Sequence, residues 1–336
     1  MSAPAVLGVD VGGTGIKARL VAAAPGPGGP DGLDARPDVL TEYRVPTPHD
    51  DPDGHVLAGV VTELARTARA AARAAGMTLG AIGVVVPGIV DERAGRVVLA
   101  VNMGWRDVPL RAVLVDALAA AGITVPVAFG QDVRAGALAQ ARAGGAATLH
   151  GSMAFVAVGT GLASALVVDG LVLDADGWAG EIGQVVITGG PHSGLRVEEI
   201  ASAGAVARRA AAPDARSVAD RVRAGDPVAT AVWDDCVAVL ADAIAWITVV
   251  GGCARVVVGG GLAEAGDLLL GPLAVALAAR LPGVRVPAIR PAQHGDAAGA
   301  VGAVALAGDA LAAAARTPDA RTADALAAEV PRDEIR

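Results

Sequence analysis

The chain is poor in aromatic residues, cysteine and lysine. Aromatic side chains make up 2% of the 336 residues, so the core of the fold has to be built from alanine, valine and leucine. The two cysteines, Cys236 and Cys253, are too few for the disulfide framework that is typical of small secreted proteins. Among the 27 lysine and arginine residues, every one except Lys17 is arginine. This single lysine lies close to the first glycine-rich turn.

The sequence also lacks features that would direct it to a membrane or to nucleic acid. It contains no run of about 18 uncharged apolar residues, and no basic segment of a signal peptide precedes the first apolar residues. The formal net charge is −8, which leaves no excess positive charge to displace counterions from nucleic acid. No helix-turn-helix precedes the first strand. We therefore expect a cytoplasmic protein that binds neither nucleic acid nor a membrane.

Both halves of the chain alternate short apolar strands with helices. In the first half the expected strands are 6–10, 17–22, 40–46, 81–86 and 125–129, and the expected helices are 56–75, 110–121 and 133–142. In the second half the expected strands are 153–158, 163–169 and 255–258, and the expected helices are 198–212, 228–250, 267–280 and 296–315. The Pro/Gly-rich segment 24–38 is expected to be a loop, and 316–336 a flexible tail.

A strand, a glycine turn and a second strand occur in this order in each half. This repeat predicts two α/β domains of one plan that face each other across a cleft. We expect an N-terminal lobe over residues 1–131 and a C-terminal lobe over 132–295. The helix at about 296–315 is expected to return to the N-terminal lobe.

The first glycine turn, Asp10-Val11-Gly12-Gly13-Thr14, predicts a phosphate site. Glycine permits positive φ and a close approach of the backbone, and successive amides in such a turn form an anion-binding nest. Thr14 adds a hydroxyl donor, and Lys17 on the return strand lies near enough to support the same anion. Because Asp10 would repel a bound phosphate, the arrangement predicts Mg²⁺ between them. A plain hairpin turn remains the alternative for this segment alone.

Two further glycine turns follow apolar strands, namely Gly159-Thr160-Gly161 and Gly259-Gly260-Gly261. The first of these repeats the phosphate turn in the second half, so the two turns could grip one polyphosphate from both sides. The second lies between a strand and a helix and leaves room for a flat group such as adenine or ribose. Each turn by itself also fits an ordinary loop, and no Walker-type G-x-x-x-x-G-K-[ST] sequence occurs.

The three turns together resemble the two phosphate motifs and the adenosine motif of the actin-like sugar kinase superfamily. The sequence between them is similar to the ROK family (repressor, open reading frame, kinase). Further matches, in family order, are Val86-Pro87-Gly88-Ile89-Val90, Asn102 with Trp105, Gln131-Asp132, Gly180-Glu181-Ile182-Gly183 and Glu198 with Ala201-Ser202. The resemblance covers residues 6–305 and implies two actin-like, ribonuclease H-like domains of mixed sheet with helices on both faces.

The resemblance also implies a role for each motif. Asp132, which follows a strand at a turn into a helix, falls on the catalytic base of the family; its position alone favours a helix N-cap. ATP with Mg²⁺ near Asp10 is the implied donor, and a homodimer the implied assembly. The implied donor-site residues are Asp10, Gly12, Gly13, Thr14, Lys17, Gly159, Thr160, Gly161, Gly259, Gly260 and Gly261. The implied sugar-site residues are Gly88, Asn102, Gln131, Glu181, Gln184 and Glu198.

The sequence departs from the family pattern at two glutamines and at the zinc motif. Gln131 stands where an Asn usually precedes the catalytic Asp, and Gln184 where a His usually serves both sugar and zinc. The expected C-x-C-G-x-x-G-C segment is replaced by residues 189–196, which contain no cysteine. His192 alone cannot supply the roughly four ligands of a structural zinc site. We therefore expect no zinc, and a sugar pocket that differs from that of a plain glucose kinase.

These observations favour ATP-dependent phosphorylation of the 6-hydroxyl of a hexose or amino-hexose, as in glucokinases. Two alternatives within the same class are a polyphosphate-dependent glucokinase and a kinase for a modified aminosugar such as kanosamine. An alternative of a different class is a sugar-binding regulator without catalytic activity. Asp132 argues against the regulator, as does the lack of a DNA-binding domain.

Overall fold

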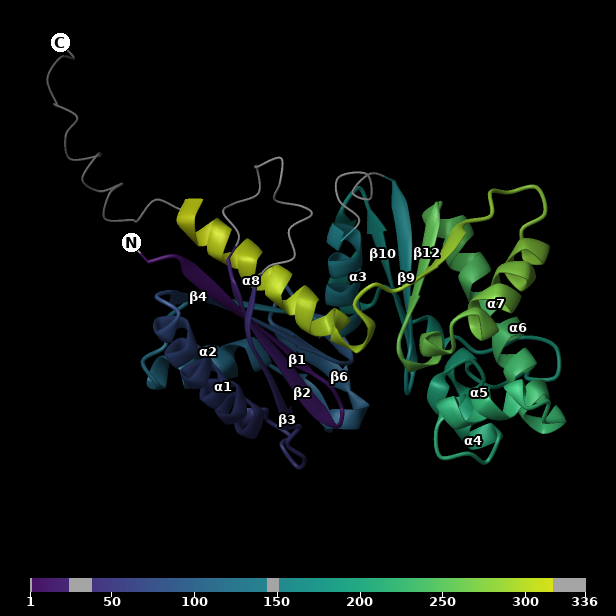
Figure 1. Cartoon of the computed structure of the whole chain (residues 1–336), viewed down its shortest axis with the longest axis horizontal. Helices are drawn as coiled ribbons and strands as arrows, with labels where there is room; N and C mark the ends of the chain where they lie inside the picture. Colours follow the sequence, from purple (N-terminus) through teal and green to yellow (C-terminus); the bar gives the residue numbers. More distant parts are fainter. Residues whose placement is uncertain (1, 24–37, 144–150, 317–336) are drawn as a thin grey trace, which may run out of the picture.

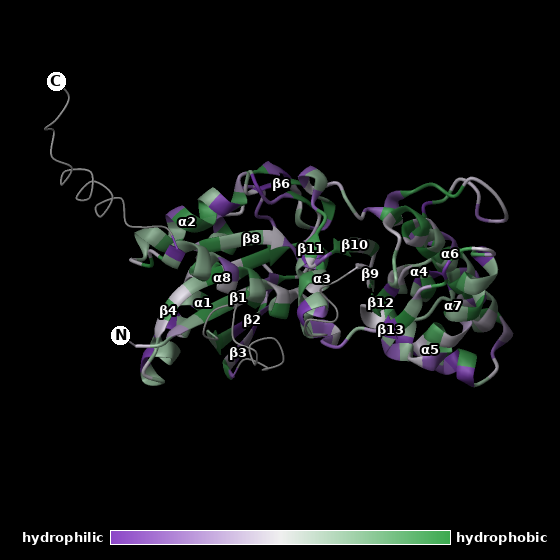
Figure 2. Cartoon of the chain, turned by 90° about the horizontal axis from the view of Figure 1, so that it is seen from above, coloured by the Kyte–Doolittle hydropathy of each residue, from purple (hydrophilic) through white to green (hydrophobic). Residues whose placement is uncertain are grey.

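The computed structural model describes residues 2–23, 38–143 and 151–316, which form two lobes joined through central helices (Figure 1). The segments 24–37 and 317–336, expected to be a loop and a tail, lie outside the described residues. Each lobe contains a five-stranded mixed sheet covered by helices. In the hydropathy colouring of Figure 2, hydrophobic residues predominate along most of the helices and strands of both lobes.

The sheet of the first lobe has the strand order β3-β2-β1-β4-β8. Its strands are β1 (Pro4–Val11), β2 (Gly15–Ala22), β3 (Val39–Pro46), β4 (Thr78–Val86) and β8 (Val127–Gln131). The first three form antiparallel hairpins, whereas β4 and β8 run parallel to β1. Leu7 and Val9 of β1 pack against helices α1 (His55–Ala74) and α2 (Leu110–Ala120), so this face carries the larger core of the lobe.

The sheet of the second lobe repeats this order as β11-β10-β9-β12-β13. Its strands are β9 (Ser152–Val158), β10 (Leu162–Val168), β11 (Leu171–Val172), β12 (Arg255–Gly259) and β13 (Ala288–Pro291). Helices α6 (Pro227–Gly251) and α7 (Asp267–Arg280) pack on one face, and α3 (Asp132–Ala143) on the other. The common order confirms the predicted α/β fold of two lobes with one plan.

The last described helix, α8 (Ala298–Arg316), returns from the second lobe and lies on the free face of the first sheet (Figure 1). The contact is close enough to require glycine in the strands. A Cβ on Gly8 would lie 2.5 Å from the amide nitrogen of Val304, and one on Gly83 would overlap the carbonyl oxygen of Ala303. Among the described helices, α8 is long and apolar enough to span a membrane by length and composition; here it packs on β1 and β4.

Several parts of the fold differ from the sequence expectations, among them the strands β11 and β13, which the sequence does not predict. A small antiparallel sheet of β5 (Ile89–Asp91), β6 (Arg96–Ala100) and β7 (Trp105–Val108), and helix α5 (Ala215–Arg223), were not predicted. The helix expected over 198–212 is wrong. Glu198 lies in the 3₁₀ turn η5 (Val197–Glu199), and helix α4 (Ala203–Arg209) begins later. It begins there because the Ser202 hydroxyl accepts a hydrogen bond from the Ala205 amide and caps the helix.

Candidate active site

The turn between β1 and β2 is held by hydrogen bonds from within and from β3. The amide of Gly12 donates to the carbonyl of Gly15 (3.0 Å), and the hydroxyl of Thr47, which follows β3, donates to the carbonyl of Gly12 (2.6 Å). Positive φ, expected here, is found at neither Gly12 nor Gly13. Open space is what distinguishes Gly13, since a Cβ there would meet nothing within 4 Å. The backbone of this turn is therefore accessible to a ligand.

The two glycine turns of the second lobe lie side by side, because β9 and β12 are neighbouring parallel strands. In the β9–β10 turn, the Gly159 amide donates to the carbonyl of Gly161 (3.0 Å). Gly260, after β12, does require positive φ (82°), and its Cβ would lie 2.5 Å from the carbonyl oxygen of Val158. A cavity of about 260 Å³ lies next to Gly261 and is lined by Trp233 from α6 and by residues of α5. A flat group has room in this cavity, next to Gly261.

Asp10 and Lys17 face each other across the first hairpin, as a register pair of β1 and β2. The Lys17 ammonium donates to the backbone carbonyl of Asp296 (2.6 Å) and lies 3.2 Å from its carboxylate. Burial raises the pKa of Asp10 to about 6, although the charge of Lys17 opposes this rise. Lys17 thus joins the first hairpin to the segment that enters α8, a long-range contact for which the sequence carries no signal.

The first turn of α8 lies directly against Asp10. A Cβ on Gly299 would lie 2.6 Å from the Asp10 carboxyl carbon and 2.6 Å from its Oδ2. We therefore expect Gly299→Ala to displace this carboxylate and to lower kcat/KM for the phosphoryl donor about tenfold, with a smaller effect on the sugar KM. Steady-state kinetics with each substrate varied in turn would measure this. Gly308→Ala, on the same helix with nothing near its Cβ, is the control.

Asp132 begins α3, but the helix cap comes from another residue. The side-chain oxygen of Gln131 accepts a hydrogen bond from the Arg134 amide (2.8 Å), which is the bond an N-cap residue makes. Asp132 accepts only from the adjacent Val133 amide (2.8 Å) among the hydrogen bonds found at its carboxylate in the described structure. Asp132 is therefore not the N-cap of α3. The side-chain oxygen of Gln131, an expected sugar ligand, is instead occupied by its hydrogen bond to the helix.

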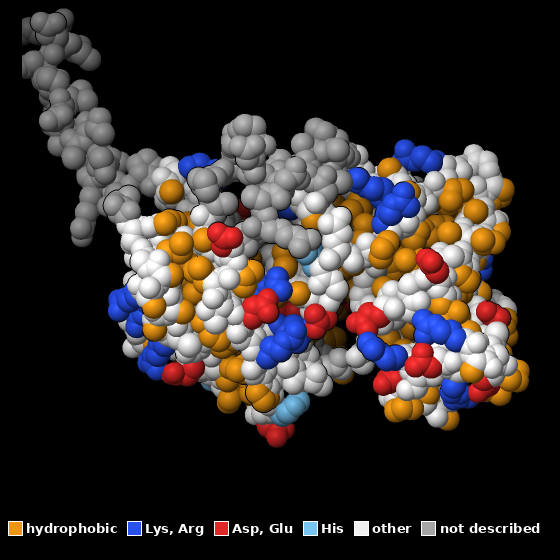
Figure 3. Space-filling model, viewed as in Figure 1, with side chains coloured by type: hydrophobic (Ala, Val, Ile, Leu, Met, Phe, Trp, Pro, Cys, Tyr) orange, Lys and Arg blue, Asp and Glu red, His pale blue; other side chains and the backbone are white. Residues whose placement is uncertain are grey.

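The surroundings of Asp132 are acidic and come from both lobes. Burial, followed by the negative charges of Asp10 and Glu181, raises the pKa of Asp132 to about 7, while the charge of Arg134 lowers it. Asp10 belongs to the first lobe and Glu181 to the second, so Asp132 lies between the two. On the face drawn in Figure 3, acidic and basic side chains gather on both sides of the groove between the lobes.

Three expected sugar-site residues of the second lobe are close to one another and to Arg196. Burial raises the pKa of Glu181, the charge of Arg134 opposes this rise, and the negative charge of Glu198 adds to it. The Arg196 guanidinium donates to the side-chain oxygen of Gln184 (2.9 Å) and lies 3.0 Å from the carboxylate of Glu198. A Cβ on Gly161 would lie 3.1 Å from the same carboxylate, so Glu198 borders the β9–β10 turn. Sequence reasoning missed Arg196, although a cation two residues before Glu198 was a usable signal.

Gly88 lies in the turn between β4 and β5, and Asn102 lies in the 3₁₀ turn between β6 and β7. Gly88 has φ of 100°, and a Cβ there would overlap the carbonyl oxygen of Leu99, so the turn after β4 requires glycine. Asn102 is exposed and lines a cavity of about 510 Å³ together with residues 48–52. Trp105, its partner in the motif, is buried and donates to the carbonyl of Asp51 (2.7 Å). This tryptophan therefore positions the Asn102 turn.

The residues present fit Mg²⁺ carried by a phosphate ligand better than a metal held by protein alone. Within the described ranges, no three His, Cys, Asp or Glu side chains are grouped so that they could hold a metal ion. Mg²⁺ needs only one or two carboxylates when phosphate oxygens and water complete its shell. Asp10, half-buried beside the accessible glycine turn, provides such a carboxylate. His192, the one histidine of the segment that replaces the zinc motif, pairs with Asp235 (3.2 Å).

Comparison with known proteins agrees with these features. A model of the ROK family matches residues 6–310. The chain is 29% identical over 298 residues to a glucokinase of Halalkalibacterium halodurans, covering 80% of this chain and 83% of that protein. A ROK hexokinase structure from Thermus thermophilus is similar with a TM-score of 0.72 and 29% identity, covering 90% of this chain and 97% of that one. A ROK family glucokinase from Streptomyces griseus, in complex with glucose and AMPPNP, has a TM-score of 0.70 and 26% identity, covering 90% and 99%.

Proposed function

The chain belongs to the ROK family and is a sugar kinase, and we propose that it transfers the γ-phosphate of ATP to the 6-hydroxyl of a hexose or amino-hexose. The observation that carries the proposal is the position of Asp132. Its carboxylate lies between Asp10 of one lobe and Glu181 of the other, and a different residue caps its helix. A carboxylate between the donor turns and the sugar residues is what a general base for this transfer requires.

In the proposed reaction Asp132 accepts the proton of the sugar 6-hydroxyl. The hydroxyl oxygen forms a bond to the γ-phosphorus while the bond from that phosphorus to the β,γ-bridging oxygen breaks, so ADP leaves with the electron pair. The raised pKa of Asp132 suits this task, because a base that accepts a proton near neutral pH works best with a pKa near 7. Asp132 therefore supplies both the proton acceptor and the orientation of the attacking oxygen.

The proposed donor site uses the three glycine turns and Asp10. The amides of residues 12–14 and 159–161 hold the phosphates from the two lobes, and residues 259–261 border the adenosine in the cavity beside Trp233. Asp10 would hold Mg²⁺, which when bound neutralises phosphate charge. Lys17 supports this site indirectly, by pairing with Asp296 and lowering the pKa of Asp10. Zinc has no part in the proposal.

The proposed sugar site uses Glu181, Gln184 and Glu198, with Gly88 and Asn102 from the facing lobe. Carboxylates and amides bind pairs of sugar hydroxyls. Arg196 fixes the side chains of Gln184 and Glu198. A kinase for a modified aminosugar is the second candidate, because Gln131 and Gln184 stand where the family usually has Asn and His. Gln131 is proposed to act on the sugar only through the helix that carries Asp132.

A panel of hexoses and aminohexoses, assayed with ATP and with polyphosphate by release of sugar phosphate, tests the proposal. We expect turnover with ATP on glucose or an amino-hexose, and no product from a 6-deoxy sugar, which lacks the attacking hydroxyl. Turnover with polyphosphate alone would favour the polyphosphate-dependent alternative. Tight sugar binding without turnover on any sugar would instead support the non-catalytic regulator.

The activity should depend on pH through Asp132. Its pKa of about 7 lies above the ordinary carboxyl value, so the base is protonated and inactive at low pH. We expect kcat/KM for the sugar to fall about tenfold for each pH unit below about 7 and to level off above it. Initial rates at subsaturating sugar between pH 5.5 and 8.5 would measure this. A flat profile down to pH 5.5 would contradict a base with a raised pKa.

The domain limits, the assembly and the location of the protein also remain proposals. We propose lobes over residues 1–131 and 132–295, in keeping with the positions of the two sheets, with α8 completing the first lobe. We propose a cytoplasmic homodimer that binds neither nucleic acid nor a membrane. Analytical ultracentrifugation at micromolar concentration would contradict the assembly if it gave a single species with the mass of one chain.

A further inference from the structure

Arg134 is a buried cation that the proposed reaction does not use. It lies on α3, two residues after Asp132, and its side chain is 4% exposed. Arginine is almost never this buried unless it is fully paired. Its partners therefore indicate what it does.

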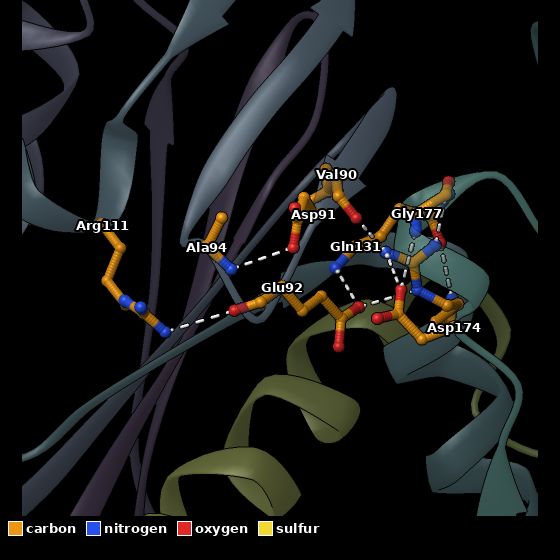
Figure 4. Close-up of polar contacts among 9 residues, drawn as sticks. Val90, Asp91, Glu92, Ala94, Arg111, Gln131, Asp174 and Gly177 are labelled. Atoms are coloured by element: carbon orange, nitrogen blue, oxygen red, sulfur yellow. Dashed lines mark hydrogen bonds and ion pairs between the residues drawn. The ribbon is translucent and has the colours of Figure 1, made fainter.

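The guanidinium of Arg134 binds both lobes at once. On the first lobe, its Nε lies 2.7 Å from the carboxylate of Glu92 and its Nη2 donates to the carbonyl of Val90 (2.6 Å). On the second lobe, its Nη1 donates to the carbonyl of Gly177 (3.3 Å), and its Nη2 lies 3.4 Å from the carboxylate of Asp174. Figure 4 shows these partners converging from the β5 strand and from the 174–177 turn.

The same carboxylate of Glu92 also holds the end of β8. Its Oε1 accepts from the Gln131 amide (3.0 Å) as well as from Arg134, so one oxygen binds residues on both sides of Asp132 (Figure 4). Gln131 in turn caps α3 through the Arg134 amide. The backbone that carries Asp132 is thus fixed before and after it.

The lobes also touch through their backbones at this point. Gly177 has φ of 88°, and a Cβ there would overlap the carbonyl of Val90. No side chain lies between the backbone of Gly177 and that of Val90 at this contact. The lobes therefore meet here in a close backbone contact, and Arg134 donates a hydrogen bond to each side of it.

We propose that Arg134 is the positioning residue that holds Asp132 in register with both lobes. The inference rests on the proposed function, since it assigns Arg134 to the base of that reaction. The planar guanidinium offers several donors in a fixed fork, so it can bind the Val90 carbonyl and the Glu92 carboxylate together; lysine cannot. A misplacement of about 1 Å in a reacting group can lower the rate about 100-fold.

Charge gives a second effect that can be measured separately. The groups that face Asp132 are the carboxylates of Asp10 and Glu181, which raise its pKa, and Arg134, which lowers it. Loss of the Arg134 charge should therefore shift the acid limb of the kcat/KM profile for the sugar to higher pH. Lysine at this position keeps the positive charge but lacks the planar set of donors of the guanidinium. Methionine lacks both the charge and the donors.

The test compares Arg134→Lys and Arg134→Met with Arg111→Met as the matched control. Arg111 donates to the backbone carbonyls of Glu92 (3.2 Å) and Arg93 (3.0 Å), so it binds the same loop without reaching Asp132 (Figure 4). We expect Arg134→Lys to lower kcat about tenfold with the acid limb unchanged. Arg134→Met should lower kcat about 100-fold and move the limb to higher pH. Arg111→Met should stay within about twofold of the wild type.

Binding of a non-hydrolysable ATP analogue, measured by calorimetry, should be nearly unchanged in both Arg134 variants; the sugar affinity is measured as well, because the charge of Arg134 also acts on Glu181. If they fold and match the wild type in kcat and in pH profile, the inference is overturned. If the Arg134 variants do not fold, Glu92→Gln replaces them, because glutamine keeps the shape of the Glu92 side chain and removes its negative charge. A kcat of Glu92→Gln equal to that of the wild type would overturn the inference. A wild-type chain that phosphorylates no sugar would overturn the proposed function instead.

Discussion

Replacing Asp132 by Asn should abolish phosphoryl transfer while sugar binding is retained. The amide has nearly the shape of the carboxylate but cannot accept the proton of the attacking hydroxyl. General-base catalysis contributes about 10²- to 10⁴-fold, so we expect kcat to fall by that factor. Coupled assays of ADP release give kcat, and calorimetry gives the sugar affinity. Asp116→Asn, an exposed carboxylate of α2, is the control and should leave both unchanged.

The same substitution should stabilise the protein at alkaline pH. The folded-state pKa of Asp132, about 7, lies above the ordinary value of 3.8, so the folded chain holds a proton that the unfolded chain releases. The stability that this group contributes is fully present below about pH 3.8 and is lost as the pH rises through about 7. Asparagine has no charge to bury, so Asp132→Asn should raise Tm at pH 8 and have little effect near pH 4. Full activity in this variant would contradict the assigned base.

Replacing Gly180 by Ala should both destabilise the protein and weaken sugar binding. Gly180 has φ of 98°, and a Cβ there would overlap the carbonyl oxygen of Ser164 in β10. The Ser164 amide donates to the Gly180 carbonyl (2.8 Å), so relief of the overlap would break a bond that holds Glu181 in place. We expect a loss of about 2–3 kcal/mol in the free energy of unfolding. The sugar kcat/KM should fall about tenfold as Glu181 moves.

Gly190→Ala separates the two causes of the expected loss in stability, namely the positive φ and the overlap with Ser164. Gly190 also has positive φ, 76°, but a Cβ there would meet nothing within 4 Å. This control should therefore lose only the backbone preference of glycine, about 1 kcal/mol. Urea denaturation of both variants measures the difference. Equal losses would mean that the overlap with Ser164 is absorbed by the loop, and that Gly180 does not position Glu181.

The features that could be predicted from the sequence are those encoded over short distances. A glycine turn between two apolar strands is a local pattern, and its two copies were sufficient to predict two lobes of one plan. The same holds for Asp132, whose position after a strand and before a helix is visible in a few residues. The predicted helix at Glu198 failed for a local reason too, because the Ser202 cap competes with any helix start before it.

The features that could not be predicted depend on contacts between distant segments. Arg134 resembles any other arginine on a helix until β5 and the 174–177 turn are brought to it. Lys17 is noticeable by its rarity, but its partner Asp296 is far away in the chain. Gln131 was read as a sugar ligand because the family has an amide there. Its use as the cap of α3 is visible only in three dimensions.

Helix α8 has a consequence for how the protein is made. The strands of the first sheet leave the ribosome early, yet the helix that covers one face of them is among the last segments translated. At about 5–20 residues per second, synthesis of the chain between β8 and α8 takes on the order of 10–30 s. During that interval the sheet face at Gly8 and Gly83 lacks the helix that covers it in the folded protein. The lobe that is synthesised first is completed last.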